Sequence, residues 1–409
     1  MNKESPVPRL REDLEIIPTS YQGERAVVVR DFLGLIRDPI VIQGDALNLL
    51  GLIDGKRTVR DIQLELVRFN QGVLVDAELI SRIVAELDSA HLLQSRKCQE
   101  EKERILNEYA GLKIRRASHA GVSYPAQPDK LRDYLDSILN DPEVGDGGRS
   151  WSQIVGLVAP HIDLEIGRKT YARAYRAIRD QTPQRVFLLG TSHSHSEGFF
   201  CLTEKDFETP FGRVETDRAA VRALRRAGDS IVSAHDISHR REHSLEFQLL
   251  FLQRLFGQSF SLVPVLCGSF SGELGKVSRP SEIPAVGRFL AALRSLWEED
   301  GGHGLVVAGV DFSHIGPKFG HRERAATLLG EAKNHDLKLI DALSRGDVLG
   351  FWGEARRVGD RYNVCGLSAL ATLLELLPEA RGHTLDYDVW NEAPTQSAVS
   401  YAALVLAAD

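Results

Sequence analysis

The sequence predicts an α/β protein in which a largely parallel sheet lies between two layers of helices, preceded by a small α+β domain. From Ile114 onward, apolar runs of strand length alternate with amphipathic helical segments, which is the pattern of a three-layer α/β domain. Several of these runs end at polar clusters that contain histidine. The first hundred residues differ, because helical periodicity dominates them.

The length and composition favour a soluble protein of more than one domain. A chain of 409 residues exceeds a typical domain of roughly 100–200 residues. The net charge of -7 means that the chain as a whole lacks the excess positive charge typical of nucleic-acid-binding proteins. No apolar run has the length of a signal peptide or a membrane span, so we expect a cytoplasmic protein. The four cysteines form no C-x-x-C pair and are expected to be free thiols.

The chain is interpreted as four segments. Residues 1–25, rich in charge and proline, are expected to be a tail or an irregular lead-in. Residues 26–95 contain two short strands, three helices and a closing strand at Leu92–Ser95, which suggests a winged-helix-like domain. Residues 96–113 are expected to be a helical linker with a solvated face. Residues 114–409 form the layered α/β domain.

The first domain resembles a known peptide-binding unit. Thr58 and Asp61 predict a capping box that opens a helix over Val59–Phe69. The order D-G-K-R-T-V-R-D-I, from Asp54 to Ile62, resembles PqqD-like domains, which are winged-helix units that present leader or precursor peptides to radical enzymes. The alternatives are a structural lid or a DNA-binding winged helix, and the few basic residues of the first helix argue against DNA.

The second domain is predicted from alternating periodicities. Runs of four to nine apolar residues predict buried strands, and apolar residues at helical spacing predict the helices between them. The predicted strands are Ile154–Ala159, Val186–Leu189, Phe260–Leu266, Leu305–Val310 and Ala398–Leu406, and the predicted helices are Ala126–Asn140, Gly167–Asp180, Glu246–Phe256, Ile283–Leu296, Ala325–Leu343 and Gly366–Leu377.

Three of the predicted strands end at histidine. Ligand sites on open α/β sheets lie beyond the carboxyl ends of the strands, so we expect these ends to share one pocket. One such histidine alone would more often be a satisfied polar group, but three together predict a metal site, because imidazole is the commonest metal ligand. The residues delivered by the three strands are His161 with Asp163, His193 with His195, and Asp311 with His314.

Other residues offer further roles at this pocket. The carboxylate of Asp163 is a candidate to supplement the metal shell, and His195 is a candidate ligand, a supporting group or an exposed side chain. The spacing in D-F-S-H suits a carboxylate, Asp311, that orients the imidazole of His314. Cys365 precedes a predicted helix, whose dipole favours a thiolate that a metal can bind.

A second polar cluster opens a predicted helix at Arg241–Gln248, R-E-H-S-L-E-F-Q. Glu242 or Ser244 can cap this helix. Glu242, His243 and Glu246 are then near one another and form a candidate acid/base cluster. Simple capping with a pair at i and i+3 explains the same residues equally well.

The second domain contains a series of short motifs in a definite order. The motifs run in order through residues 114–406 as R-R-A-S-H-A-G-V-S-Y-P-A, A-P-H, L-G-T-S-H, T-P-F-G, E-H-S-L-E, V-P-V-L, D-F-S-H, C-G and V-S-Y-A-A. No single motif is specific, but their order is similar to that of the Memo family and the B proteins of AmmeMemoRadiSam systems. The resemblance implies a fold similar to class III extradiol dioxygenases, built on a non-haem iron site.

The resemblance also implies roles for individual residues. A cysteine replaces the carboxylate of the usual two-histidine, one-carboxylate triad, which argues against ordinary ring cleavage because thiolate is softer and redox-active. The residues I-D-L follow A-P-H where relatives often have A-G-Y, so the pocket wall is expected to differ. The implied metal ligands are His161, His193 and Cys365, Asp311 and His314 match further pocket residues, and His243 occupies the place of an acid/base histidine.

Three hypotheses follow for the function. The first is a redox enzyme or dioxygenase-like protein of unknown substrate that binds Fe(II), with copper as the second choice of metal, and O₂ at an open coordination position. The second is a non-catalytic adaptor whose first domain binds a peptide or a radical-SAM partner of the same system, since a free strand edge can pair with a peptide. The third is a zinc-dependent hydrolase.

Overall fold

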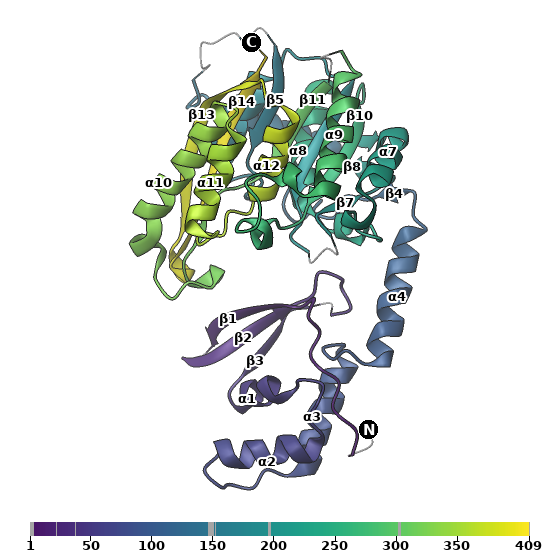
Figure 1. Ribbon diagram of the computed structural model, residues 1–409, viewed down its shortest axis with the longest axis vertical. Coiled ribbons are helices and arrows are strands. Elements are labelled where there is room, and N and C mark those ends of the chain that lie inside the picture. Colours follow the sequence, from purple (N-terminus) through teal and green to yellow (C-terminus); the bar gives the residue numbers. More distant parts are fainter. Residues whose placement is uncertain are drawn as a thin grey trace. The chain divides into compact units, whose positions relative to one another are not determined.

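Two compact units make up the computed structural model of the chain, Met1–Gly111 and Leu112–Asp409 (Figure 1). Each unit has hydrophobic clusters of its own. Among the described residues, no helix combines the length and apolar composition needed to cross a membrane. The described residues are 4–21, 23–36, 38–145, 151, 153–194, 198–301 and 304–408.

The first unit consists of a small antiparallel sheet followed by helices. Its three strands have the order β1-β2-β3. The strands are β1 (Glu15–Tyr21), β2 (Glu24–Arg30) and β3 (Ile40–Gln43), and the helices are α1 (Asp45–Leu52), α2 (Val59–Phe69), α3 (Ala77–Ser89) and α4 (Arg96–Ala110).

The capping box predicted for α2 is confirmed. The backbone N–H of Asp61 donates to Thr58 Oγ1 (3.2 Å), and the backbone N–H of Thr58 donates to Asp61 Oδ2 (2.9 Å). The two bonds satisfy N–H groups that have no partner inside the helix. Helix α2 then buries Val59, Ile62 and Leu66 in the core of the first unit.

Two expectations for the first unit are corrected. The stretch over residues 1–25 is not an irregular lead-in, because β1 pairs with β2 along its whole length and Val7 is buried in the core. Pro18 obscured this strand in the sequence, but an edge strand tolerates proline. The closing strand expected at Leu92–Ser95 is reduced to an isolated bridge between Leu93 and Leu10.

The second unit is built on an eight-stranded mixed sheet. Its main order is β12-β14-β5-β11-β6-β10-β7, and β13 pairs with β14. The four central strands β5, β11, β6 and β10 are parallel, whereas β14 and β7 run antiparallel to their neighbours. The strands are β5 (Ile154–Ala159), β6 (Arg185–Thr191), β7 (Phe200–Leu202), β10 (Ser261–Cys267), β11 (Gly304–Gly309), β12 (His314–Ile315), β13 (Arg381–Glu392) and β14 (Ser397–Ala407).

The sheet is therefore less parallel than the sequence predicted. The pair β13–β14 accounts for most of the difference, because β14 returns antiparallel along β5. Antiparallel neighbours need no crossover helix, and an apolar run does not encode its direction in a sheet. A separate small sheet contains β4 (Ile114–Arg115), β8 (Asp206–Thr209) and β9 (Gly212–Val214).

Helices cover both faces of the large sheet. Alternate residues of β6 enter two different hydrophobic clusters, Val186 and Leu188 on one face and Phe187 and Leu189 on the other. Helices α5 (Pro128–Leu139), α6 (Arg168–Ala177) and α8 (His243–Phe256) share the first cluster. The second cluster is shared by α7 (Arg218–Gly228), α9 (Pro284–Glu298), α10 (Ala325–Ser344), α11 (Val348–Val358) and α12 (Leu367–Leu376).

The predicted strands and helices of residues 114–409 are all present, with ends displaced by a few residues. Helices α7 and α11, strand β13 and the short strands β4, β7, β8, β9 and β12 were not predicted. Strand β13 has many polar side chains, which obscures it in the sequence. Helices α7 and α11 bury apolar residues at helical spacing, so both were predictable from periodicity.

Two glycines let α8 approach the strand ends closely. A Cβ atom at Gly190, in β6, would lie 2.5 Å from Ser244 Oγ. A Cβ atom at Gly309, the last residue of β11, would lie 2.3 Å from the carbonyl oxygen of Ser244. The first turn of α8 therefore rests on the carboxyl ends of β6 and β11, which places His243 beside the residues that follow these strands.

We expect Gly309→Ala to lower the free energy of unfolding by about 2–3 kcal/mol, because the new methyl group meets backbone that cannot move aside without shifting α8. Urea unfolding measures the change. The matched control is Gly330→Ala, at an exposed position of α10 with open space around it, where alanine should stabilise the helix by about 1 kcal/mol. Equal effects of the two substitutions would contradict the close approach.

Candidate metal centre

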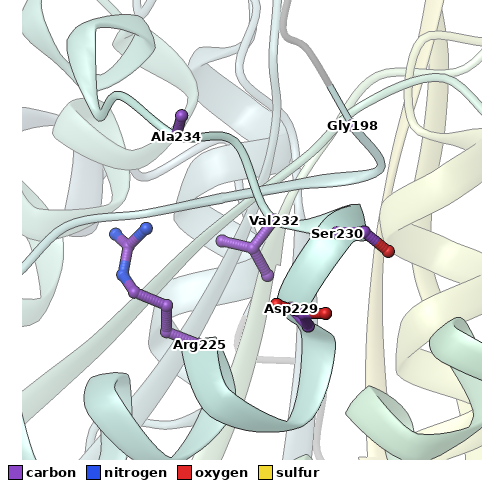
Figure 2. A pocket seen from close by; sticks show the side chains of 6 residues that line it. All are labelled: Gly198, Arg225, Asp229, Ser230, Val232 and Ala234. Carbon is purple, nitrogen blue, oxygen red and sulfur yellow. The ribbon is translucent and has the colours of Figure 1, made fainter.

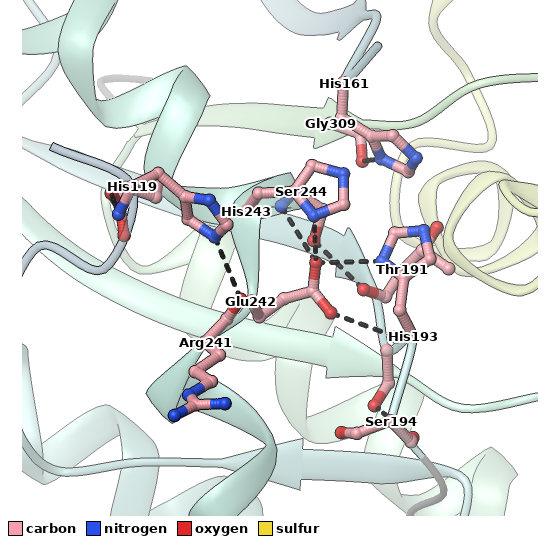
Figure 3. Close-up of polar contacts among 12 residues, drawn as sticks. His119, His161, Thr191, His193, Ser194, Arg241, Glu242, His243, Ser244 and Gly309 are labelled. Carbon is pink, nitrogen blue, oxygen red and sulfur yellow. Dashed lines mark hydrogen bonds and ion pairs between the residues drawn. The ribbon is translucent and has the colours of Figure 1, made fainter. Parts of the chain in front are cut away.

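Three histidines from distant parts of the sequence meet at the carboxyl edge of the sheet (Figure 3). His161 follows β5, His193 follows β6, and His243 is the first residue of α8. One ring nitrogen of each lies within 4.8 Å of the other two. This separation is compatible with all three rings facing one metal ion.

Hydrogen bonds fix the orientation of two of these rings. His161 Nδ1 lies 2.9 Å from the carbonyl oxygen of Gly309, and His193 Nδ1 lies 2.9 Å from Glu242 Oε1. An acceptor at this distance holds the proton on Nδ1, so the lone pair of Nε2 is available to a metal.

Glu242 is a buried carboxylate that connects two of the histidines. It caps α8 by accepting the backbone N–H of Ser244 (2.9 Å), and it also accepts the backbone N–H of His193 (2.9 Å). Its Oε1 lies 3.4 Å from His243 Nδ1. Burial by itself raises the pKa of Glu242, but the charge of His193 and its hydrogen bonds hold that pKa well below the usual value. The sequence offered Glu242 only as a cap or a member of an acid/base cluster.

Most imidazoles of the site favour the neutral form. Burial lowers the pKa of His161 to about 3, and it also lowers the pKa values of His243 and His314. His193 is the exception, because burial lowers its pKa but the charge of Glu242 and the hydrogen bonds with Cys365 and Glu242 together raise it well above the usual value. Neutral imidazole is the form that binds metal, so protons compete weakly at His161 and His243.

Cys365 lies next to the histidine cluster, immediately before α12. Its Sγ is 3.5 Å from His161 Nε2 and 3.4 Å from the carbonyl oxygen of Asp311. It is partly buried, whereas Cys98, Cys201 and Cys267 are buried, and all four are free thiols as expected. Burial raises the pKa of Cys365, and the hydrogen bond with His193 acts in the opposite direction.

Asp311 and His314 lie at the same edge but do not form the pair expected from D-F-S-H. Asp311 Oδ1 accepts the backbone N–H of His161 (3.0 Å), and its Oδ2 is 3.6 Å from His161 Nε2. His314 Nδ1 is oriented instead by the carbonyl oxygen of Phe312 (3.0 Å). Asp311 therefore holds the backbone of His161 and places a carboxylate oxygen near its Nε2, instead of orienting the ring of His314.

The candidate acid/base cluster at the start of α8 separates into two parts. Glu242 and His243 face the site, but Glu246 does not. The buried carboxylate of Glu246 pairs with Arg115 and accepts the backbone N–H groups of Ser118 (3.0 Å) and His119 (2.9 Å). Glu246 therefore fastens the R-R-A-S-H-A-G segment, and an acid/base role for it is wrong.

His119 is a neighbour of the site that the sequence analysis missed. Its ring centroid is 5.7 Å from that of His243, in an edge-to-face arrangement. Its Nε2 lies 3.0 Å from the carbonyl oxygen of Arg241. The signal was present in the motif A-S-H-A-G, but no strand delivers this histidine, so the search along strand ends passed over it.

One other candidate does not join the site, and a second lies outside the described residues. The exposed carboxylate of Asp163 accepts the backbone N–H groups of Glu165 (2.9 Å) and Ile166 (3.3 Å), so it closes its own turn and does not supplement a metal shell. His195 lies outside the described residues.

A cavity of about 570 Å³ lies apart from these histidines (Figure 2). The guanidinium of Arg225 at its wall donates to the carbonyl oxygens of Leu202 (2.9 Å) and Ser233 (3.2 Å), so it is already engaged. The lining residues are Gly198, Arg225, Asp229, Ser230, Val232 and Ala234.

The buried carboxyl of Asp311 predicts a pH dependence of stability. Burial raises its pKa from 3.8 to about 6, so between these values the folded state holds a proton that the unfolded state releases. In metal-free protein we expect the free energy of unfolding of the wild type, relative to Asp311→Asn, to fall by up to about 3 kcal/mol as the pH rises from 4 to 7. Urea unfolding across this range measures the difference, and a constant difference would contradict the shift.

Comparison with known proteins agrees with the order of the motifs. The family model described as Memo-like protein matches residues 115–405. A MEMO1 family protein of Aquifex aeolicus is 32% identical over 394 residues, which cover 92% of this chain and 95% of that protein. A MEMO1 family protein of Thermus thermophilus is 30% identical, covering 86% and 99%, and one of Pyrococcus furiosus is 29% identical, covering 72% and 99%. The chain therefore belongs to the Memo family.

Proposed function

We propose that this protein is a metal-dependent redox enzyme, oxidase-like or dioxygenase-like, whose Fe(II) ion is bound by His161, His193 and Cys365. The observation that carries the proposal is the buried cluster of three histidines beside a thiol at the carboxyl edge of the sheet. Imidazole and thiolate together suit Fe(II), copper and zinc. When bound, Fe(II) or copper supplies one-electron chemistry and the activation of O₂.

Three residues in this proposal handle protons or contact the substrate. His243 is held less firmly than His193, because its Nδ1 is 3.4 Å from Glu242 Oε1 whereas that of His193 is 2.9 Å away. A ring with this freedom is suited to accept and release protons next to the ligands. Asp311, with a pKa of about 6, changes its protonation near neutral pH. His314 lies at the edge of the site and is the third residue proposed to handle protons or contact the substrate.

Metal content tests the ligand set. Protein purified without oxygen should contain near-stoichiometric iron or copper and consume O₂ with a suitable reductant. His161→Ala and Cys365→Ser should lose most of the metal, whereas His243→Ala should retain it and lose O₂ consumption. The matched control is His235→Ala, at an exposed histidine, which should change neither.

Each other result has a definite meaning. Metal lost in His243→Ala but kept in Cys365→Ser would replace the proposed ligand set with three histidines. Stoichiometric zinc without O₂ consumption would favour the hydrolase. No metal in the wild type would contradict the proposal.

We propose an adaptor role for the first unit as the second candidate function, in which a PqqD-like domain captures a peptide segment. The supporting observation is the concentration of exposed large apolar side chains in this unit. On the described surface they include Leu64 and Phe69 on α2, Val73 and Leu74 in the following loop, and Leu79 on α3. Such groups commonly mark binding surfaces. Strands β1 and β3 are also the edges of their described sheet, where a peptide can add a strand.

The double variant Phe69→Ser, Leu74→Ser tests the adaptor role in the full-length chain. Its affinity for a candidate precursor peptide or a purified radical-SAM protein, measured by calorimetry, should fall about tenfold or more, because the variant removes two apolar anchors. Val122→Ser is the matched control, since Val122 is an exposed apolar residue of the second unit. An unchanged affinity in the double variant would exclude this surface.

A further inference from the structure

Two loops of the second unit carry residues of the candidate metal centre. The first loop, residues 311–321, follows β11 and includes Asp311 and His314. The second loop, residues 359–366, connects α11 to α12 and includes Cys365. The position of the thiol relative to the histidines therefore depends on how these loops are joined.

The loops are joined along their backbones. Three backbone hydrogen bonds connect them, although the two loops do not pair with each other as strands. The bonds run from His314 N to the oxygen of Tyr362 (2.8 Å), from Cys365 N to the oxygen of Phe312 (3.4 Å) and from Gly366 N to the oxygen of Asp311 (3.0 Å).

Side chains add further links between the loops. His321 Nε2 lies 2.8 Å from the carbonyl oxygen of Arg361, and Asn363 makes two bonds to the first loop. Asn363 Nδ2 donates to the carbonyl oxygens of His314 (3.2 Å) and Phe319 (3.0 Å). Two carbonyl acceptors require a donor with two hydrogens, which an amide supplies and a carboxylate does not. Asn363 thus connects the second loop to the histidine of the first loop and to the turn that follows it.

The second loop has a backbone conformation that needs such support. Gly359, Asp360 and Asn363 all have left-handed φ values, of 63°, 55° and 50°. For residues other than glycine this region costs about 1–2 kcal/mol each, although Asn and Asp tolerate it best. The carboxylate of Asp360 accepts the backbone N–H of Val364 (3.1 Å) and the hydroxyl of Ser271 (2.5 Å). Contacts on both sides of Tyr362 therefore maintain the loop.

We propose that Asn363 is a positioning residue, which holds the thiol of Cys365 against the histidine cluster by clamping the second loop to the first. Asn363 stands two residues before Cys365, whose Sγ is 3.5 Å from His161 Nε2. Without the two bonds of Asn363 the second loop is held to the first less tightly, and the position of the sulfur against His161 becomes less fixed. The inference deepens the proposed function, on which its importance for metal binding rests.

The reactivity of the thiol tests the clamp in metal-free, full-length protein. Cys365 is the one cysteine of the four that is not buried, so a disulfide reagent reports mainly on it, and Cys365→Ser measures the background. Asn363→Asp keeps the size and the left-handed preference but replaces the donor with an acceptor. Asn363→Gly keeps the backbone freedom and removes the side chain. Both should react about tenfold faster than the wild type, as expected for the loss of two hydrogen bonds.

Asn140→Asp is the matched control, because Asn140 is exposed at the end of α5. In this variant the thiol of Cys365 should react at the wild-type rate. A second measurement uses cobalt(II), whose thiolate absorption band reports the sulfur as a ligand. The band should weaken in both Asn363 variants, with an apparent Kd raised about tenfold.

Wild-type reactivity and a wild-type cobalt band in both Asn363 variants would overturn the proposal. If wild-type protein binds no cobalt and no iron, the proposed metal site fails, but faster labelling of the Asn363 variants in metal-free protein would still support the clamp. The two hypotheses are therefore tested separately.

Discussion

The carboxylate of Glu242 is the group on which the geometry of the candidate site depends most. It accepts the first free N–H group of α8, the backbone N–H of His193 and the Nδ1 proton of the same imidazole. Burying a carboxylate costs free energy unless its oxygens accept hydrogen bonds. Here the same hydrogen bonds that satisfy Glu242 connect the start of α8 to the residues after β6. Helix capping, docking of α8 and orientation of His193 are thus a single interaction.

Close packing makes this interaction possible. Gly190 and Gly309 leave the space into which the first turn of α8 settles, so His243 comes within reach of the residues after β5 and β6. The same burial keeps His161 and His243 neutral, which a metal site requires. The arrangement that stabilises the sheet edge therefore also prepares the histidines for binding.

The two units of the chain relate differently to the Memo family. The family model begins at Arg115, close to the boundary between the units, and the Pyrococcus furiosus relative covers 72% of this chain with 99% of its own length. The second unit is thus the part that the family shares. The Aquifex aeolicus relative covers 92% of this chain, so its similarity extends into the first unit. Exposed large apolar side chains are concentrated in the first unit, whereas the second unit contains the histidine cluster.

The sequence by itself determined the local structure and the approximate position of the site. Apolar runs predicted the strands of the central sheet, and their polar ends pointed to His161 and His193, because the end of a buried strand is a local feature of the chain. The capping box of Thr58 and Asp61 was equally local. Periodicity does not state the direction of a strand in a sheet, so the antiparallel pair β13–β14 was not predicted.

Only the tertiary structure decided which side chains meet. Glu242 is the N-cap of α8 and Glu246 lies in its first turn, yet Glu242 faces the histidines and Glu246 faces Arg115, because the N-cap residue has extended rather than helical backbone angles. Asp311 accepts the backbone N–H of the distant His161, whereas the ring of its near neighbour His314 is oriented by the carbonyl oxygen of Phe312. The clamp by Asn363 joins two loops that are about fifty residues apart in the chain. Contacts of this kind depend on the packing of whole elements, which no local pattern of residues encodes.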